Sequence, residues 1–367
     1  MAGGGAYRDL EVLSRLHRNF AAIRLYIGNF PGARKQTLQG VELIPLGFGG
    51  NEILSRFTFA ILANLRILFQ GRDPMGISLS LYSPLPAAGL HRKRMYAVLH
   101  HIIGKNWTRK LGSLGRLLDG LESLYYRLPR NFVVSNDAVA EEILRQNPDA
   151  RVLRSANGFD PELLAVKDAS GTVPPCIIFI GRLDVFMKGL DLLIEAFALV
   201  AAQLPDLKLI LAGRGDPESE KTLLNLARDL GLEGKVSLRT NISDAEKRAL
   251  LSQCLLFCSP SRYEGWGIAA LEANAAGKPV VVSEASGFKN SISDGYSGIR
   301  VGIGDKQALA EAVLGLLRDP ERRQRMGLQA REWALGFTWD AIAEKEAAWM
   351  ADSLGGKGNQ RELKGVE

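Results

Sequence analysis

Short apolar segments alternate with longer amphipathic segments along most of the 367-residue chain. The short segments are typical of buried strands, and the longer ones carry apolar residues at helical spacing. Repeated strand–helix alternation places helices against parallel sheets. The sequence therefore predicts an α/β architecture with parallel sheets.

The expected elements can be placed along the chain. In the first half we expect strands at Ile23–Ile27, Val41–Leu46, Ile77–Tyr82, Ala97–Ile103, Phe132–Ser135 and Arg151–Leu153, and helices at Tyr7–Arg18, Asn51–Phe69, Leu114–Tyr126 and Asp137–Gln146. In the second half we expect strands at Cys176–Gly181, Leu207–Ala212, Val236–Leu238 and Leu255–Ser259, and helices at Gly189–Gln203, Glu218–Leu230, Asp244–Gln253 and Trp339–Leu354.

A chain of this length is expected to form two domains. The polar, proline-containing stretch 160–175 has the composition of a linker between them. Residues 355–367 offer little to bury, and we expect a flexible tail there.

The stretch Arg262–Glu272 most strongly indicates chemistry. It has the pattern of a strand end, a turn with Gly265 and Gly267, and a helix. Backbone N–H groups at a helix N-terminus suit a phosphate. Glu264, in the turn, suits the neutral part of a ligand, such as sugar hydroxyls. The stretch therefore predicts a site for a sugar joined to a phosphate.

Glu264 and Glu272 stand eight positions apart, and this spacing resembles the E-x7-E signature of retaining glycosyltransferases of family 4, which have the GT-B fold. The resemblance covers most of the chain, with its specific motifs in the C-terminal half. It implies two Rossmann-like, doubly wound domains facing a cleft. It places an acceptor-binding domain at residues 1–165 with a crossover helix at about 340–354, and a nucleotide-sugar-binding domain at 166–339.

The start of the chain departs from this family's pattern, which has a strand before its first glycine-rich turn. Here Gly3-Gly4-Gly5 follows Met1 almost at once. Either the chain starts late or the N-terminal sheet lacks its middle strand, and we favour a late start. In both cases the first strand of the N-terminal domain is missing.

The resemblance implies roles for residues after the first strands of the second domain. In the family an Arg and a Lys grip the diphosphate, and these correspond to Arg182, which follows Gly181, and Lys188. Fixed cations there stabilise the charge that develops on a leaving phosphate. Gly213, in a turn that resembles the family's G-x-G-P, either lies near the nucleotide or only satisfies turn geometry.

The same resemblance places Glu264 beside the transferred sugar and Glu272 beside the ribose hydroxyls, with Gly265, Gly267 and Ile268 completing the donor site. In this family the leaving phosphate is thought to act as the base while the acceptor attacks from the same face. The predicted catalytic residues are thus Glu264, Arg182, Lys188 and a histidine from the first domain.

That histidine is His100 or its neighbour His101, at the end of an apolar segment. Adjacent strand side chains point to opposite faces, so one of the two can face the ligand. His100 matches the family position better. Asn290 stands where the family commonly has Glu, which leaves the details of sugar recognition open.

The net charge of +6 is uneven, with +8 in residues 1–165 and −2 in the remainder. A basic cluster in the first half suits a solvated face or an anionic membrane surface with a lipid-linked acceptor. Nucleic acid is not expected as a partner, because no aromatic residues are interleaved with the basic ones. The cluster consists of Arg92, Lys93, Arg94, Lys105, Arg109, Lys110 and Arg116.

No metal or other cofactor is expected, apart from the nucleotide-sugar as donor substrate. Cys176, Cys254 and Cys258 lie in or beside apolar segments and are best interpreted as core residues. No D-x-D-type carboxylate pair follows a strand. We expect a cytoplasmic protein, either free or peripheral at the inner face of the membrane.

The sequence favours a metal-independent, retaining hexosyltransferase that moves a sugar to a lipid-linked or glycan acceptor in cell-surface glycoconjugate synthesis. Two alternatives stay open. One is a non-catalytic GT-B partner subunit, which a missing first strand would favour. The other is a nucleotide-sugar epimerase or a phosphorylase on the same fold.

Overall fold

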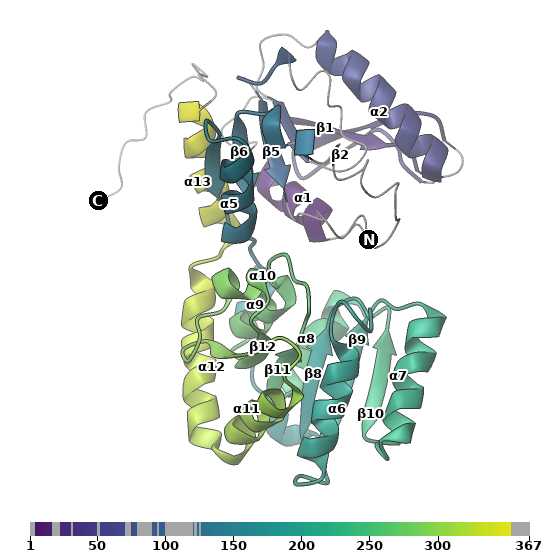
Figure 1. Cartoon of the computed structure of the whole chain (residues 1–367), viewed down its shortest axis with the longest axis vertical. Coiled ribbons are helices and arrows are strands. Elements are labelled where there is room, and N and C mark those ends of the chain that lie inside the picture. The colour runs from purple at the N-terminus through teal and green to yellow at the C-terminus, as the bar shows by residue number, and fades with distance from the viewer. Residues whose placement is uncertain are drawn as a thin grey trace. The chain divides into compact units, whose positions relative to one another are not determined.

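The computed structural model describes residues 4–16, 23–30, 32–49, 52–69, 75–78, 90–93, 95–99, 120, 123–124 and 126–353. The chain forms two compact units (Figure 1). Unit 1 comprises Met1–Ala156 and Trp339–Glu367, and unit 2 comprises Asn157–Thr338. Every predicted site residue except His100 therefore lies in unit 2.

Six parallel strands form the sheet of unit 2 (Figure 1). In chain order they are β8 (Cys176–Ile180), β9 (Lys208–Gly213), β10 (Val236–Thr240), β11 (Leu256–Ser259), β12 (Val280–Ser283) and β13 (Gly298–Val301). Across the sheet the order is β10-β9-β8-β11-β12-β13. The chain thus builds outward from β8 in one direction, then returns to β11 and builds in the other. In such a doubly wound sheet ligands bind at the carboxyl ends of the strands where the direction reverses.

Helices cover both faces of this sheet. They are η1 (Pro161–Ala165), η2 (Ser170–Thr172), α6 (Leu190–Ala201), α7 (Pro217–Asp229), α8 (Asp244–Gln253), α9 (Ile268–Ala275), α10 (Ser286–Ser291), α11 (Lys306–Arg318) and α12 (Pro320–Leu335). Apolar residues of α6, α7 and α11 form the core on one face. Those of η1, α8, α9 and α10 form the core on the other face.

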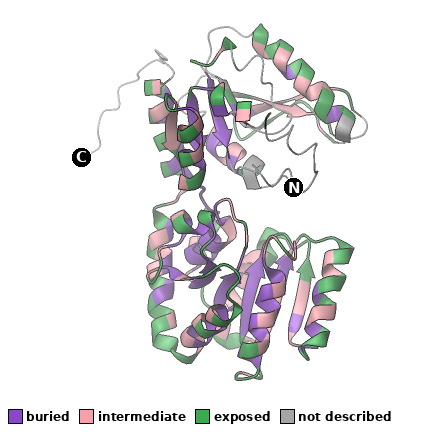
Figure 2. Ribbon diagram, in the orientation of Figure 1, coloured by how far each residue is buried: buried purple, intermediate pink, exposed green. Residues whose placement is uncertain are grey.

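The sequence of β8 explains why both faces are covered. Ile177 and Phe179 belong to the first core, whereas Cys176, Ile178 and Ile180 belong to the second. Successive side chains of a strand point to opposite faces, so an uninterrupted apolar strand must be buried on both sides. All five residues of β8 are buried, as Figure 2 shows for the centre of the sheet.

The described residues of unit 1 form two sheets. Parallel strands β1 and β3, with β2 antiparallel to β3, form one; four parallel strands in the order β4-β5-β6-β7 form the other. The strands are β1 (Ile23–Gly28), β2 (Gln36–Leu38), β3 (Val41–Leu46), β4 (Met75–Ser78), β5 (Met95–Leu99), β6 (Asn131–Val134) and β7 (Arg151–Arg154). In the described residues no strand pairs with both β1 and β4 to join the sheets.

Helices among the described residues of unit 1 include α1 (Gly4–Leu16), α2 (Glu52–Leu68), α5 (Asp137–Gln146) and α13 (Trp339–Ser353). The described part of this unit opens with α1 instead of a strand. Apolar residues of α1 and α13 share one core with residues from both sheets, among them Ile23 of β1 and Val98 of β5. Helix α1 therefore packs against both sheets.

A buried ion pair joins α1 to α13. The side chains of Arg8 and Glu346 are 2% and 1% exposed, and the Arg8 guanidinium donates to Glu346 Oε1. Ser155 Oγ donates to the same oxygen at 2.5 Å. Tyr96 interacts electrostatically with this ion pair. Burial and the charge of Glu346 raise the pKa of its hydroxyl.

The sequence predicted most strands and helices of the described residues, and the α/β class with parallel sheets is confirmed. Strand β2 was missed, because its three exposed residues carry no apolar pattern. Strand β13 and helices α10, α11 and α12 were not predicted either. The predicted helix Leu114–Tyr126 lies largely outside the described residues.

The prediction of a linker at 160–175 was wrong. The boundary between the units falls after Ala156, and Phe159 and Leu163 are buried in the second core of unit 2. Leu163 within this stretch and Phe159 just before it anchor the segment in the core of unit 2, and η1 contacts α9. Composition alone conceals such isolated anchors.

Replacing Glu346 by Ala should destabilise unit 1 by about 3–5 kcal/mol, because it leaves the Arg8 guanidinium buried without its partner. Urea unfolding, combined with hydrogen exchange of peptides from α1 and α13, would measure the loss. Glu344→Ala, at an exposed position of the same helix, is the matched control and should change little. Equal effects of both substitutions would contradict a stabilising role for the pair.

Candidate functional site

The backbones after β8 and β9 approach each other closely. Gly181 N donates to Ala212 O at 2.9 Å, and Leu183 N donates to Arg214 O at 2.6 Å. Gly213 has a φ of 141°, and a Cβ added there would lie 1.8 Å from Gly181 O. Gly213 is thus required by the packing of these two strand ends. This requirement is the alternative in which Gly213 satisfies turn geometry.

The loop after β8 also packs against the loop after β11. Gly189, the first residue before helix α6, has a φ of 63°, and a Cβ there would lie 2.2 Å from Pro260 O. Asp184 shapes the same loop, because its carboxylate accepts from Met187 N at 2.8 Å. These contacts bring Lys188, at the end of one loop, beside the residues that follow β11.

Lys188 and Glu264 form an ion pair at this point. Lys188 Nζ donates to Glu264 Oε2 at 2.8 Å, and the two side chains are 19% and 15% exposed. Ser261 Oγ lies 3.4 Å from the same carboxylate oxygen. Two predicted catalytic residues that are far apart in the sequence are therefore in direct contact, where the strand order reverses between β8 and β11.

The first turn of helix α10 holds the turn from Glu264 to Gly267. Gly287 N donates to Glu264 O at 3.1 Å, and a Cβ on Gly287 would lie 2.5 Å from Trp266 N. Gly267 has a φ of 89° and precedes helix α9, which starts at Ile268. The predicted glycine turn thus exists, and the backbone geometry at Gly267 favours a glycine there.

Helices α6 and α9, which begin beside this turn region, have no side-chain cap, and neither does the short helix α10. In contrast, α5, α7, α8, α11 and α12 are each capped by an Asn, Asp or Ser side chain, namely Asn136, Asp216, Ser243, Asp305 and Asp319. A helix N-terminus without an anionic or hydroxyl cap keeps its partial positive charge available to a ligand. In the chain, the start of α6 follows Lys188 and the start of α9 follows Glu264.

Arg182 lies on the same loop as Lys188 but does not join that pair. Its side chain is 67% exposed, and its guanidinium is 3.6 Å from Asp184. An exposed arginine on a short loop can turn toward an anion at little cost. The structure therefore places Arg182 near the end of β8 without showing it bound to Glu264.

Glu272 lies one helical turn into α9 and is buried. Its Oε1 accepts from Lys247 Nζ of α8 at 2.7 Å. Burial raises the pKa of Glu272, and the charge of Lys247 offsets part of that shift. The two acidic residues of the motif are thus each paired with a lysine from a different element.

Two residues of this region were not recognised from the sequence as important. Arg262 donates to both oxygens of Asp191, at 2.7 and 2.8 Å, and to Phe186 O at 2.9 Å. Its guanidinium stacks on the Phe186 ring at 4.6 Å, so it fastens the loop that carries Lys188. The second unrecognised residue is Lys247. In the sequence its role was indicated only by its position one turn after the capping residue Ser243, and no motif marks it.

His100 and His101 lie outside the described residues, and so do Arg94, Lys105, Arg109, Lys110 and Arg116 of the basic cluster. Arg92 and Lys93 are described and exposed. Within the described residues no group of three or more His, Cys, Asp or Glu side chains could hold a metal ion. No helix among them is long and apolar enough to cross a membrane.

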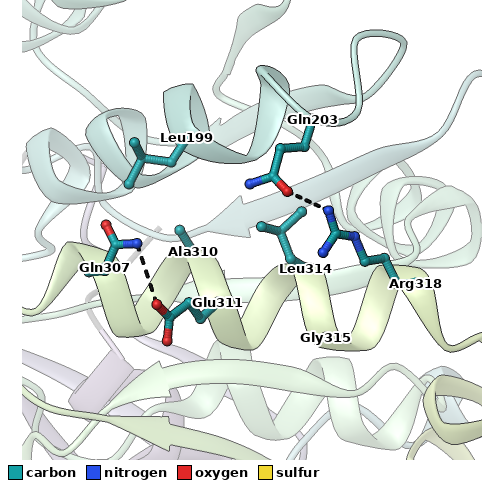
Figure 3. A pocket seen from close by; sticks show the side chains of 8 residues that line it. All are labelled: Leu199, Gln203, Gln307, Ala310, Glu311, Leu314, Gly315 and Arg318. Carbon is teal, nitrogen blue, oxygen red and sulfur yellow. Dashed lines mark hydrogen bonds between the residues drawn. The ribbon is translucent and has the colours of Figure 1, made fainter.

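A hollow of about 340 Å³ lies elsewhere in unit 2, between α6 and α11 (Figure 3). Its polar side chains bond to one another, Gln307 to Glu311 and Arg318 to Gln203 (Figure 3). It contains none of the predicted site residues. The chemistry-bearing side chains gather at the carboxyl edge of the sheet instead.

Comparison with known proteins gives a family match within unit 2. Residues 164–333 match the family model of the glycosyl transferases group 1. A phosphatidyl-myo-inositol mannosyltransferase of Mycobacterium leprae is 32% identical over 170 residues, 46% of this chain and 44% of that protein. A D-inositol 3-phosphate glycosyltransferase of Corynebacterium aurimucosum is 35% identical over 48% of this chain and 43% of that protein. The match spans less than half the length of these curated relatives.

Solved structures resemble nearly the whole chain. Sucrose-phosphate synthase from Thermosynechococcus elongatus superposes with a TM-score of 0.77 at 19% identity, over 96% of this chain and 94% of that one. Anabaena HepE in complex with UDP-glucose superposes with a TM-score of 0.75 at 18% identity, over 96% and 97%. At these identities the likeness shows the fold, and the expected GT-B fold with two Rossmann-like domains is confirmed.

Replacing Gly213 by Ala should destabilise unit 2 by about 2–3 kcal/mol, because the new methyl group must displace the Gly181 carbonyl and the φ is strained. Calorimetry, with hydrogen exchange of peptides from β8 and β9, would detect the loss. Gly171→Ala is the matched control, since nothing lies within 4 Å of its added Cβ. A Gly213→Ala protein as stable as the control would show that this close approach is wrong.

Proposed function

We propose that this protein is a retaining glycosyltransferase of the family 4 type, which transfers a sugar from a nucleotide-sugar to an acceptor. The Lys188–Glu264 pair carries the proposal, because it puts a cation and a carboxylate together where the strand order reverses. A sugar joined to a diphosphate needs both: positive charge for the phosphates and hydrogen-bond acceptors for the hydroxyls.

The positive groups of the site suit the leaving diphosphate. Breaking the bond between sugar and diphosphate places negative charge on the phosphate oxygens. Lys188, Arg182 and the uncapped N-termini of α6 and α9 stabilise that charge. In this proposal these groups do so without a metal ion.

The two glutamates hold the neutral parts of the donor. Glu264 accepts hydrogen bonds from hydroxyls of the transferred sugar, and Glu272 accepts from the ribose. When the donor binds, Lys188 moves its hydrogen bond from Glu264 to a phosphate oxygen and frees the carboxylate for the sugar. The leaving phosphate then takes the proton of the acceptor hydroxyl, which attacks from the same face, so the anomeric configuration is retained.

The acceptor is proposed to be a lipid-linked molecule or glycan for the cell surface. Two curated relatives are described as inositol glycosyltransferases, and one of these names a phosphatidyl lipid. Helix α2 of unit 1 supports a membrane-surface location, because a line of its large apolar side chains is exposed. These side chains are Leu54, Phe57, Ile61, Leu65 and Leu68.

The function can be tested with a panel of nucleotide-sugars. We expect one of them to raise the melting temperature and, with a suitable acceptor, to yield a product of retained configuration by NMR. Glu264→Gln should lower kcat about 100- to 1,000-fold, because a preorganised group at the reacting sugar is lost. Glu272→Ala should mainly raise the donor KM. Glu233→Gln, at an exposed position, is the control.

Three outcomes would contradict the proposal. A well-folded protein that binds no nucleotide-sugar would be a non-catalytic partner subunit. Equal, small effects of Glu264→Gln and Glu272→Ala on turnover of a confirmed donor would remove the site assignment. Formation of an epimerised nucleotide-sugar without any acceptor would indicate the epimerase alternative.

A further inference from the structure

Glu272, the second glutamate of the motif, is buried. Its proposed role in binding the ribose must be compatible with this burial. The side chain of Glu272 is 9% exposed, and it lies on α9 behind the turn that holds Glu264. A buried carboxylate is unstable as an anion unless a positive group or several donors compensate it. A neutral carboxylic acid would be a poorer acceptor for sugar hydroxyls.

Lys247 provides that compensation. Its side chain is 16% exposed, and its Nζ lies 2.7 Å from Glu272 Oε1 and 3.7 Å from Asp244 Oδ1. In the described part of the chain, Lys247 is the hydrogen-bond partner that the structure shows for Glu272. The pair leaves the second carboxylate oxygen, Oε2, to accept from a ligand.

The position of Lys247 is itself fixed by the edge of the sheet. Ser243 and Glu246 form a capping box that starts α8, and Lys247 N donates to Ser243 O at 2.9 Å. Just before the helix, Asn241 N donates to Gly213 O at 2.9 Å. The first turn of α8 is thus tied to the same strand ends that form the candidate donor site.

From this geometry we infer that Lys247 is a positioning residue of the donor site. It holds the Glu272 carboxylate ionised and aimed, so that the carboxylate can accept both hydroxyls of the donor ribose. Lys247 acts through Glu272 and does not itself contact the nucleotide. The inference rests on the proposed function, since it specifies how the nucleotide part of the donor is recognised.

The charges around Glu272 explain why the lysine matters. Asp160, before η1, and Asp244, on α8, both face the pair and raise the pKa of Glu272, in addition to the larger effect of burial. Lys247 is the group that opposes them, and its own pKa is raised by the charge of Glu272 despite burial. Without the ammonium group, Glu272 would hold its proton to a higher pH.

The test is discrimination between ribose and deoxyribose. Isothermal titration calorimetry would compare UDP with 2′-deoxyUDP, and GDP with 2′-deoxyGDP. We expect the wild-type protein to bind one ribonucleotide about tenfold or more tighter than its deoxy analogue, as for a hydrogen bond to a charged group. Lys247→Met should bring this ratio below about threefold, and binding of the deoxynucleotide, which keeps its 3′-hydroxyl, should weaken less than binding of the ribonucleotide. Lys247→Arg should keep most of the ratio.

The pH dependence of this binding ratio distinguishes a positioning role of Lys247 from a general stabilisation of the fold. In Lys247→Met the ratio should reach its plateau at a higher pH than in the wild type, because Glu272 holds its proton to a higher pH without the ammonium group. Titration of the nucleotide phosphates cancels in the ratio. Lys306→Met removes a lysine that also pairs with a carboxylate on a neighbouring helix, Glu195, and should behave as wild type.

A folded Lys247→Met protein with the wild-type ratio would overturn the inference but leave the proposed function intact. Failure of the wild-type protein to bind any of the four nucleotides would overturn both. If Lys247→Met does not fold, Lys247→Gln takes its place. That variant keeps a donor but loses the charge, so it should show the same shift of the plateau to a higher pH.

Discussion

The close packing of two loops at the reversal of strand order determines the rest of the candidate site. Gly189 lies against Pro260 O, and Gly213 lies against Gly181 O, at distances that exclude any side chain. Because these contacts join the ends of β8, β9 and β11, charged residues from separate parts of the chain meet there. Lys188 and Glu264 form their ion pair as a direct consequence.

The charged residues of the candidate site are paired in the same way at two places. Each glutamate of the motif is paired with a lysine from another element, Glu264 with Lys188 and Glu272 with Lys247. The partly exposed first pair can exchange partners when an anionic donor arrives, since little desolvation opposes it. The more deeply buried second pair is expected to persist, because separating it would leave charges without compensation. The first pair therefore suits the reacting part of the donor and the second suits the nucleoside.

The sequence was informative where local pattern and function coincide. Lys188 and Glu264 could be predicted because each stands at a strand–helix junction with glycines nearby. Lys247 could not, because its role depends on a contact between α8 and α9 that no local spacing encodes. The linker prediction failed for a related reason, since the burial of Leu163 depends on contact with α9.

The most direct measurement is a crystal structure of the protein with UDP or GDP bound. We predict that the diphosphate lies at the N-termini of α6 and α9, within hydrogen-bond distance of Lys188 Nζ, with the ribose at Glu272. A nucleotide bound away from the ends of β8 and β11, or Lys188 still paired with Glu264 beside a bound diphosphate, would contradict the proposed donor site.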